Sequence, residues 1–264
     1  MALANALAIF LYLSCSVILI RRFVQRDSVE SNIIFPVSLL ILLALVFHAA
    51  DIFFTMKQAG GWDLGLFSSL SIASWLMAFI ALILGAKSSR AHPGIVIYPL
   101  VMISLVLKSN LPSTQTTALI DPALEWHILL SLAAYSLFAL AALQAVILSI
   151  QERQLRQHHV NGFMRKLPPL QTMEQSLFQL ITAGFILLTI GFITGVIFID
   201  DLFAQHLVHK TVLSIISWIV FATLLWGRWK YGWRGNTAIK WTLMGFILLV
   251  LAYFGSKLVL EFIL

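Results

Sequence analysis

Histidine and lysine side chains gather at one point of an otherwise apolar stretch. The sequence DDLFAQHLVHKTVLSIISW, residues 200–218, places His206, His209 and Lys210 between two aspartates and a long apolar run. His206 and His209 are three residues apart, so they share a face if a helix begins before residue 206. Two histidines do not select a metal, because zinc sites in proteins draw on a larger ligand set. Solvated residues at a helix start, capped by the aspartates, explain the same pattern.

Two further histidines occupy positions where an imidazole could bind a metal or a haem. His48 and Asp51 share a helical face, so the carboxylate could accept the imidazole N–H and fix its tautomer. A buried histidine bonded to a neighbour accounts for the same spacing. His127 follows an Asp-Pro helix start and lies beside Trp126, a residue typical of the membrane interface. It either sits in the headgroup region or coordinates a haem iron.

The sequence does not predict catalysis. Cys15 is the single cysteine, which excludes an internal disulfide and a CxxC redox pair. No nucleophile is paired with a base, and no complete metal site emerges. We therefore expect a protein that is not an enzyme.

Composition places the histidines in a membrane protein. The chain is 60% hydrophobic and 11% charged, with a mean hydropathy of +0.95, which excludes an ordinary soluble domain. Its apolar runs have the length of about 20 residues that a helix needs to cross roughly 30 Å of hydrocarbon. We predict an all-α, polytopic bundle, a single transmembrane domain over residues 1–264. The expected spans, about eight in number, are 3–20, 33–53, 66–85, 93–108, 124–150, 176–199, 210–228 and 241–262.

Basic residues predict the orientation. They concentrate in the loops that follow odd-numbered spans, and by the positive-inside rule those loops are cytoplasmic. Both termini then lie on the outer side of the membrane. The first span has no basic residue before it, so we expect a retained helix and not a cleaved signal peptide. The cytoplasmic loops explain the pI of about 9.7, so the partner is the lipid bilayer and no nucleic acid is expected.

Two motifs predict packing and anchoring. GFITG, residues 191–195, pairs small residues that let a neighbouring helix approach closely, with Gly184 one heptad earlier. GRWKYGWRG, residues 227–235, mixes cations with tryptophans. It is typical of an anchor at the inner interface that also attracts anionic lipid.

Several of these segments resemble the cytochrome c assembly membrane-protein family, which includes CcsA and CcmC. TVLSIISWIVFATLLWGRWKYGWRGNTAIKWTLMGFILLVLAYFG, residues 211–255, is similar to the end of those proteins. WHILLSLAAYSLFALAALQAVI, residues 126–147, resembles the family helix that opens with an external haem-ligand histidine, here His127. GGWDLGLFSSLSIASW, residues 60–75, resembles an earlier external loop and helix. Within the family it resembles a small eight-helix subgroup that includes YpjD and HemX, and this resemblance implies a bacterial inner membrane with both termini on the periplasmic side.

The chain also departs from the family pattern. The family carries haem on a tryptophan-rich external loop that ends in WDPKETW. Lys210 matches the lysine of that motif, but Leu207, Val208 and His209 stand where the family has Trp, Asp and Pro, and the tryptophan-rich loop is missing. After YFG the chain reads SKLVLEFIL and lacks the family's second external histidine.

The resemblance implies haem handling in cytochrome complex assembly, with haem as cofactor. His127 would then be a ligand, His206 or His209 could replace the second one, and His48 could play the intramembrane role seen in some relatives. Haem and cytochrome-maturation or other membrane proteins would be the partners. The alternative is a HemX-like membrane regulator or scaffold that binds no haem. A small-solute transporter is a third reading, which the lack of paired discontinuous helices or a chain of buried charges disfavours.

Overall fold

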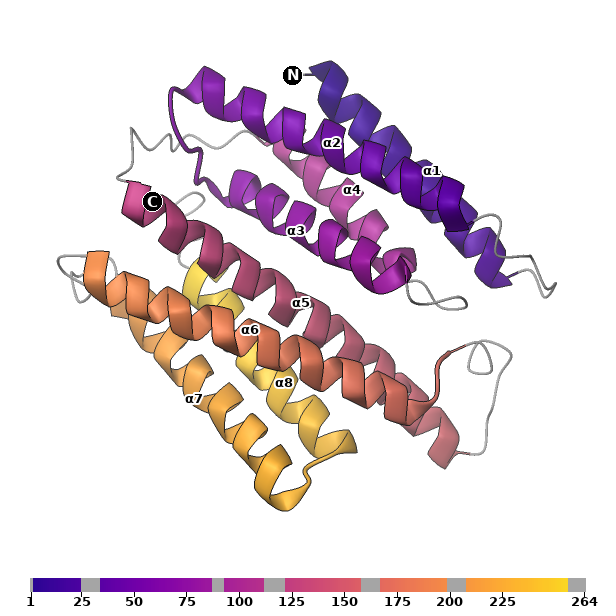
Figure 1. Cartoon of the computed structure of the whole chain (residues 1–264), viewed down its shortest axis with the longest axis vertical. Coiled ribbons are helices and arrows are strands. Elements are labelled where there is room, and N and C mark those ends of the chain that lie inside the picture. The colour runs from indigo at the N-terminus through magenta and orange to yellow at the C-terminus, as the bar shows by residue number, and fades with distance from the viewer. Residues whose placement is uncertain are drawn as a thin grey trace. The chain divides into compact units, whose positions relative to one another are not determined.

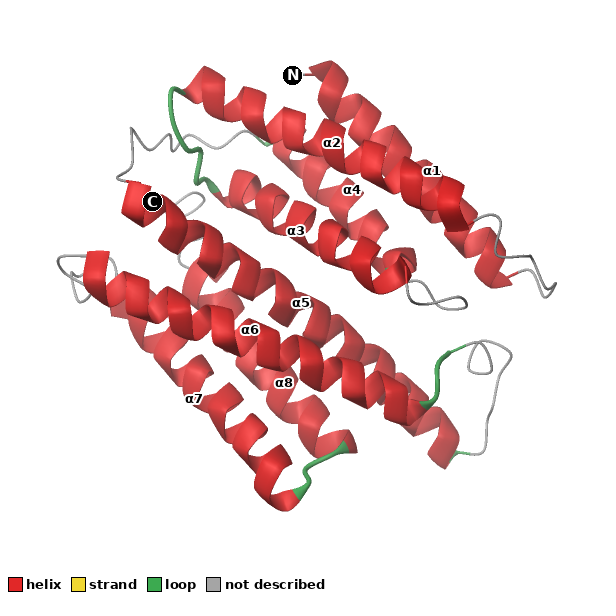
Figure 2. Cartoon of the chain, viewed as in Figure 1, coloured by secondary structure: helices red, strands yellow, loops and turns green. Residues whose placement is uncertain are grey.

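Helices make up nearly all of the described structure. The computed structural model describes residues 2–24, 34–86, 93–111, 122–157, 167–198 and 208–255. Within them the α-helices are α1 (Ala2–Val24), α2 (Ile34–Ala59), α3 (Leu66–Ala86), α4 (Gly94–Asn110), α5 (Pro122–Arg156), α6 (Leu170–Phe198), α7 (Val208–Tyr231) and α8 (Gly235–Val250). A π-helical turn, Leu251–Gly255, follows α8. Figures 1 and 2 show this all-helical arrangement, which confirms the predicted all-α fold for these residues.

Seven of these helices are long and apolar enough to cross a membrane. α4 is the exception, because it has 17 residues and contains Pro99. It begins directly after Pro93, a residue suited to a helix start because it lacks an N–H that would have no partner there. The chain is therefore a multi-pass membrane protein, while the predicted placement of its termini stays a prediction.

Several helices extend beyond the apolar runs that predicted them. α5 continues six residues past the expected end at 150, through polar helix-forming residues that include the Glu152–Arg156 pair. α6 begins at residue 170 and α8 at residue 235, both earlier than the hydropathy pattern predicts. Hydropathy marks the part of a helix that lies in hydrocarbon, so it misses polar turns at the ends.

Helix contacts divide the chain into two compact units, residues 1–120 and 121–264. In unit 1, α1 packs against α2 and α4, and α3 packs against α4 and α2. Buried side chains from all four helices meet in its core, namely Tyr12, His48, Ser71 and Tyr98. The Trp75 indole donates a hydrogen bond to the Leu45 carbonyl over 2.9 Å and thereby ties α3 to α2.

Unit 2 is a second bundle with the same order of neighbours. α5 packs against α6 and α8, and α7 packs against α8 and α6. The Phe138 and Phe221 rings stack with their centroids 3.9 Å apart and join α5 to α7. Gly245 on α8 leaves the room for the Phe221 ring, because a Cβ there would lie only 2.7 Å from it.

Candidate functional site

His127 lies in the second turn of α5 and points onto α6. Three small residues of α6 face α5: Gly195 lies against His127, Gly191 against Ser131 and Gly184 against Phe138. A Cβ on Gly195 would be 3.0 Å from Cε1 of the imidazole, so the glycine makes space for the ring. The GFITG motif thus serves the close helix packing that its spacing predicts.

Hydrogen bonds from α6 fix the orientation of this imidazole. Nδ1 of His127 is 2.9 Å from the Gly191 carbonyl oxygen and 3.1 Å from the Thr194 hydroxyl oxygen. Thr194 itself donates to the same carbonyl over 2.9 Å. A carbonyl can only accept, so Nδ1 of His127 carries the proton and donates.

The other ring nitrogen of His127 is the one that could bind a metal. In a neutral imidazole the nitrogen opposite a protonated Nδ1 holds a lone pair. Among the described residues, Nε2 of His127 has no hydrogen-bond partner, and the side chain is only half-buried. A histidine whose second nitrogen donates to a backbone carbonyl is the usual form of a protein metal ligand. The geometry therefore suits His127 to iron ligation through Nε2.

His48 has a different environment. Its side chain is fully buried in unit 1, with Nε2 2.9 Å from the Ser71 hydroxyl and Nδ1 3.5 Å from the Tyr12 hydroxyl. The Tyr12 ring also meets the imidazole edge to face, with centroids 5.9 Å apart. Both nitrogens thus face protein groups, and iron ligation by His48 would require one of these contacts to break.

Asp51 does not orient His48, and that expectation is wrong. The Asp51 carboxylate instead pairs with the Lys108 ammonium over 2.8 Å, and both side chains are almost fully buried. The Thr55 hydroxyl accepts a second hydrogen bond from Lys108 over 2.9 Å and donates to the Asp51 carbonyl. A buried carboxylate is stabilised more by a cation than by a neutral imidazole, which explains the choice of partner.

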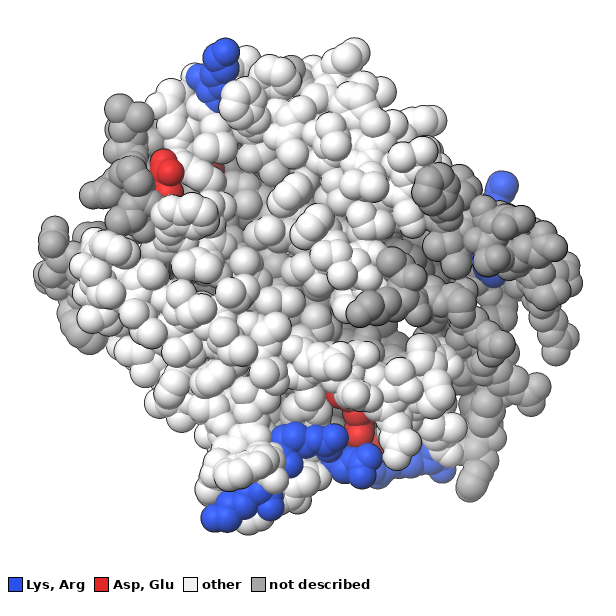
Figure 3. Space-filling view, in the orientation of Figure 1, with Lys and Arg blue, Asp and Glu red and all other residues white. Residues whose placement is uncertain are grey.

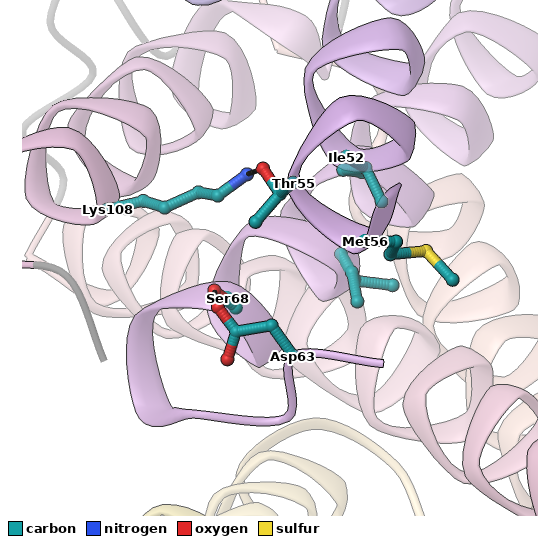
Figure 4. Close-up of a pocket in the computed structure, with 7 residues that line it drawn as sticks. Ile52, Thr55, Met56, Asp63, Ser68 and Lys108 are labelled. Carbon is teal, nitrogen blue, oxygen red and sulfur yellow. Dashed lines mark hydrogen bonds between the residues drawn. The ribbon is translucent and has the colours of Figure 1, made fainter. Parts of the chain in front are cut away.

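A small cavity adjoins this ion pair. Its walls come from the end of α2, the start of α3 and the end of α4, and they are Ile52, Thr55, Met56, Asp63, Ser68, Ile72 and Lys108. Figure 4 shows Lys108 reaching from α4 toward Thr55, with Asp63 and Ser68 beside each other at the start of α3. Asp63 accepts hydrogen bonds from the Gly65 amide and the Ser68 hydroxyl, so it stabilises the turn that leads into α3.

The sequence interpretation missed this ion pair because it placed Lys108 at the end of a span. The signal was present, since Asp51 and Lys108 are opposite charges within or at the edge of apolar runs. Ionisable residues in such runs usually face the bundle interior and pair with one another.

The remaining predicted ligands cannot be placed by their side chains. His209 lies in the first turn of α7, with its side chain outside the described residues, and His206 lies outside them altogether. α5 and α7 both begin at the end of unit 2 where α6 ends (Figure 1). Within the described ranges no group of three or more His, Cys, Asp or Glu side chains could hold a metal ion.

Comparison with known proteins identifies the family of the chain. Residues 3–264 match the cytochrome C assembly protein family over nearly the whole chain. The chain belongs to this family. Membership in the cytochrome c assembly family rests on the full set of helices and not on one motif.

Curated members of the family show the range of relatives. The inner membrane protein YpjD of Escherichia coli strain K12 is 32% identical over 225 residues, which cover 84% of this chain and 85% of that protein. The cytochrome c biogenesis protein CcsA of Guillardia theta is 25% identical, with 72% and 71% of the two chains covered. Protein HemX of Brevibacillus brevis is 20% identical, with 94% and 93% covered. The resemblance to the YpjD, CcsA and HemX proteins is thus confirmed.

Proposed function

We propose that the chain is a non-enzymatic, haem-handling factor for cytochrome complex assembly in a bacterial inner membrane, in which His127 would hold the haem iron. The family and its CcsA and YpjD relatives support the membrane and the process. The observation that carries the residue assignment is the hydrogen bond from Nδ1 of His127 to the Gly191 carbonyl.

Of the two histidines whose side chains the structure describes, His127 fits the role of a haem ligand better than His48. His127 presents Nε2 with a lone pair, while both nitrogens of His48 face hydroxyl groups. We therefore assign His127 as the first ligand. His206 and His209 stay candidates for the second position, because α7 begins at the same end of unit 2 as α5.

Bound haem would supply a redox-active iron centre. The chain's own residues orient the His127 imidazole. Gly191 and Thr194 hold the proton of His127 on Nδ1, and Gly195 sets the distance of the ring from α6.

The test is the absorbance spectrum of the purified full-length protein, together with a stoichiometric haem assay. We expect a Soret band in the wild type that His127→Ala removes. Trp126→Phe, a change at the neighbouring exposed residue, is the matched control and should leave the band unchanged. An unchanged Soret band in the His127→Ala protein would show that His127 is not a ligand.

A second candidate function is a HemX-like scaffold or regulator without haem. The observation that favours it is the missing tryptophan-rich loop, since Val208 and His209 stand where the family has Asp and Pro. This candidate predicts wild-type protein without a Soret band that copurifies with a membrane enzyme at fixed stoichiometry. The haem assay on the wild type separates the two functions.

A further inference from the structure

Cationic and aromatic side chains gather where α7 ends and α8 begins. Figure 3 shows Lys and Arg atoms along this edge of the molecule. Among the described residues, the cations at this end of unit 2 are Arg153, Arg156, Arg228, Lys230, Arg234 and Lys240. We call the segment 227–235, with the adjoining Trp226 and Lys240, the basic turn.

Among the described residues, the two carboxylates at this end of unit 2 neutralise the basic turn only in part. Glu152 lies beside Gly235 and pairs with Arg156 over 2.9 Å on α5. Glu174 is buried and accepts hydrogen bonds from the Gly235 amide over 2.6 Å and from Nε of Arg234 over 3.4 Å. The described residues of α7 and α8 contain no acidic side chain. The basic turn therefore carries a surplus of positive charge.

The fold holds the basic turn in one conformation. Gly232 and Gly235 have φ angles of 66° and 51°, in the left-handed region that favours glycine. The Trp233 ring packs so closely on Gly227 that no Cβ would fit between them. Arg228 donates to the Trp233 carbonyl over 3.1 Å and lies 4.6 Å from the centroid of the Phe178 ring.

Several groups on this rigid segment stay available to a ligand. Arg228 uses one of its N–H donors for the Trp233 carbonyl, and Arg234 is about half exposed (54%) while its Nε bonds to Glu174. Lys230 is exposed, with its ammonium 5.1 Å from the Trp226 ring centroid. Trp229 is 84% exposed.

We propose that the basic turn binds the phosphodiester headgroup of an anionic phospholipid. The surplus cations favour a negatively charged group, and lipid phosphate supplies one at the depth where a membrane helix ends. An indole as exposed as that of Trp229 is unfavourable in water but suits the boundary between headgroups and hydrocarbon. A soluble anion would leave Trp226, Trp229 and Tyr231 without a role. The proposal is independent of haem binding.

The test measures lipid retention by the purified full-length protein. Detergent-solubilised protein is mixed with phosphatidylglycerol or phosphatidylcholine, and bound lipids are counted by native mass spectrometry. We expect the wild type to retain phosphatidylglycerol in preference to phosphatidylcholine. Lys230→Gln with Lys240→Gln should weaken phosphatidylglycerol retention by about fivefold for each charge removed. Both lysines are exposed, so the fold should survive.

The matched control is Lys57→Gln, which removes an exposed lysine from α2 in unit 1 and should not change retention. Competition by inorganic phosphate distinguishes the source of the anion. Equal retention of both lipids, an unaffected double variant, or complete displacement of lipid by millimolar phosphate would each overturn the proposal. If the double variant does not fold, wild-type retention of phosphatidylglycerol must still fall as salt is raised; retention independent of salt would also overturn it.

Discussion

Nδ1 of His127 lies 2.9 Å from the carbonyl oxygen of Gly191, so a backbone group of α6 decides which nitrogen of an α5 histidine is free. The orientation depends on the close approach of the two helices, which the glycines of α6 permit. This relationship makes the properties of His127 sensitive to substitutions on a neighbouring helix.

Gly195→Ala should disturb His127 without removing it. The new Cβ would lie 3.0 Å from Cε1 of the ring, so the imidazole must shift. If haem binds as proposed, we expect retention to fall about tenfold, as for other residues that orient a metal ligand. Gly191→Ala is the control, because its Cβ would meet the Ser131 hydroxyl at an ordinary 3.4 Å and the carbonyl stays. Equal haem retention by the two variants would contradict the argument.

Ser71→Ala tests the structural role of His48. The substitution leaves Nε2 of a fully buried imidazole without its hydroxyl partner. We expect the free energy of unfolding to fall by about 1–3 kcal/mol. Ser14→Ala, which removes an exposed hydroxyl bonded within its own helix, should have a much smaller effect. Thermal unfolding in detergent measures both, and a stability loss no greater than that of Ser14→Ala would count against the role.

Asp51 and Lys108 should behave as one unit. Either Asp51→Asn or Lys108→Met leaves a buried charge without its partner, at a cost of about 3–5 kcal/mol in the free energy of unfolding. The double variant removes both charges, so it should be less destabilised than the sum of the single variants. A double-mutant cycle by thermal or denaturant unfolding gives the coupling energy, and strict additivity of the two substitutions would disprove the coupling.

Glu174→Gln should loosen the start of α8. The buried carboxylate accepts hydrogen bonds from the Gly235 amide and Arg234, and hydrogen bonds to charged groups are worth about 1.5–3 kcal/mol. Glu152→Gln is the control, since its pair with the exposed Arg156 is worth roughly 0.3–0.5 kcal/mol. Limited proteolysis within residues 227–235 should be faster only in the Glu174 variant. Equal cleavage rates would show that Glu174 does not hold the turn.

The helices could be predicted from the sequence because hydrocarbon imposes both their length and their apolar composition. Their ends could not. The start of α8 depends on the amide of Gly235 meeting Glu174, a residue 61 positions earlier in the chain. A hydropathy pattern does not record a contact between residues so far apart in the sequence. The predicted span therefore began at residue 241 and missed the first turns of the helix.

The candidate site could also be predicted only in part. His127 could be identified from its place at a helix start and from the family resemblance, but its partners Gly191 and Thr194 lie 64 and 67 residues away. Local spacing also favoured Asp51 as the partner of His48. In the structure Asp51 instead pairs with Lys108, 57 residues further along the chain, because a cation stabilises a buried carboxylate more than a neutral imidazole does.

The Asp51–Lys108 pair also bears on how the chain enters a membrane during synthesis. α4 has 17 residues, fewer than the roughly 20 that usually span hydrocarbon, and it carries Pro99 and Lys108. A lone lysine makes insertion of such a segment less favourable. α2 precedes α4 in the chain and is synthesised first, so we expect its Asp51 carboxylate to offset the cost of inserting Lys108.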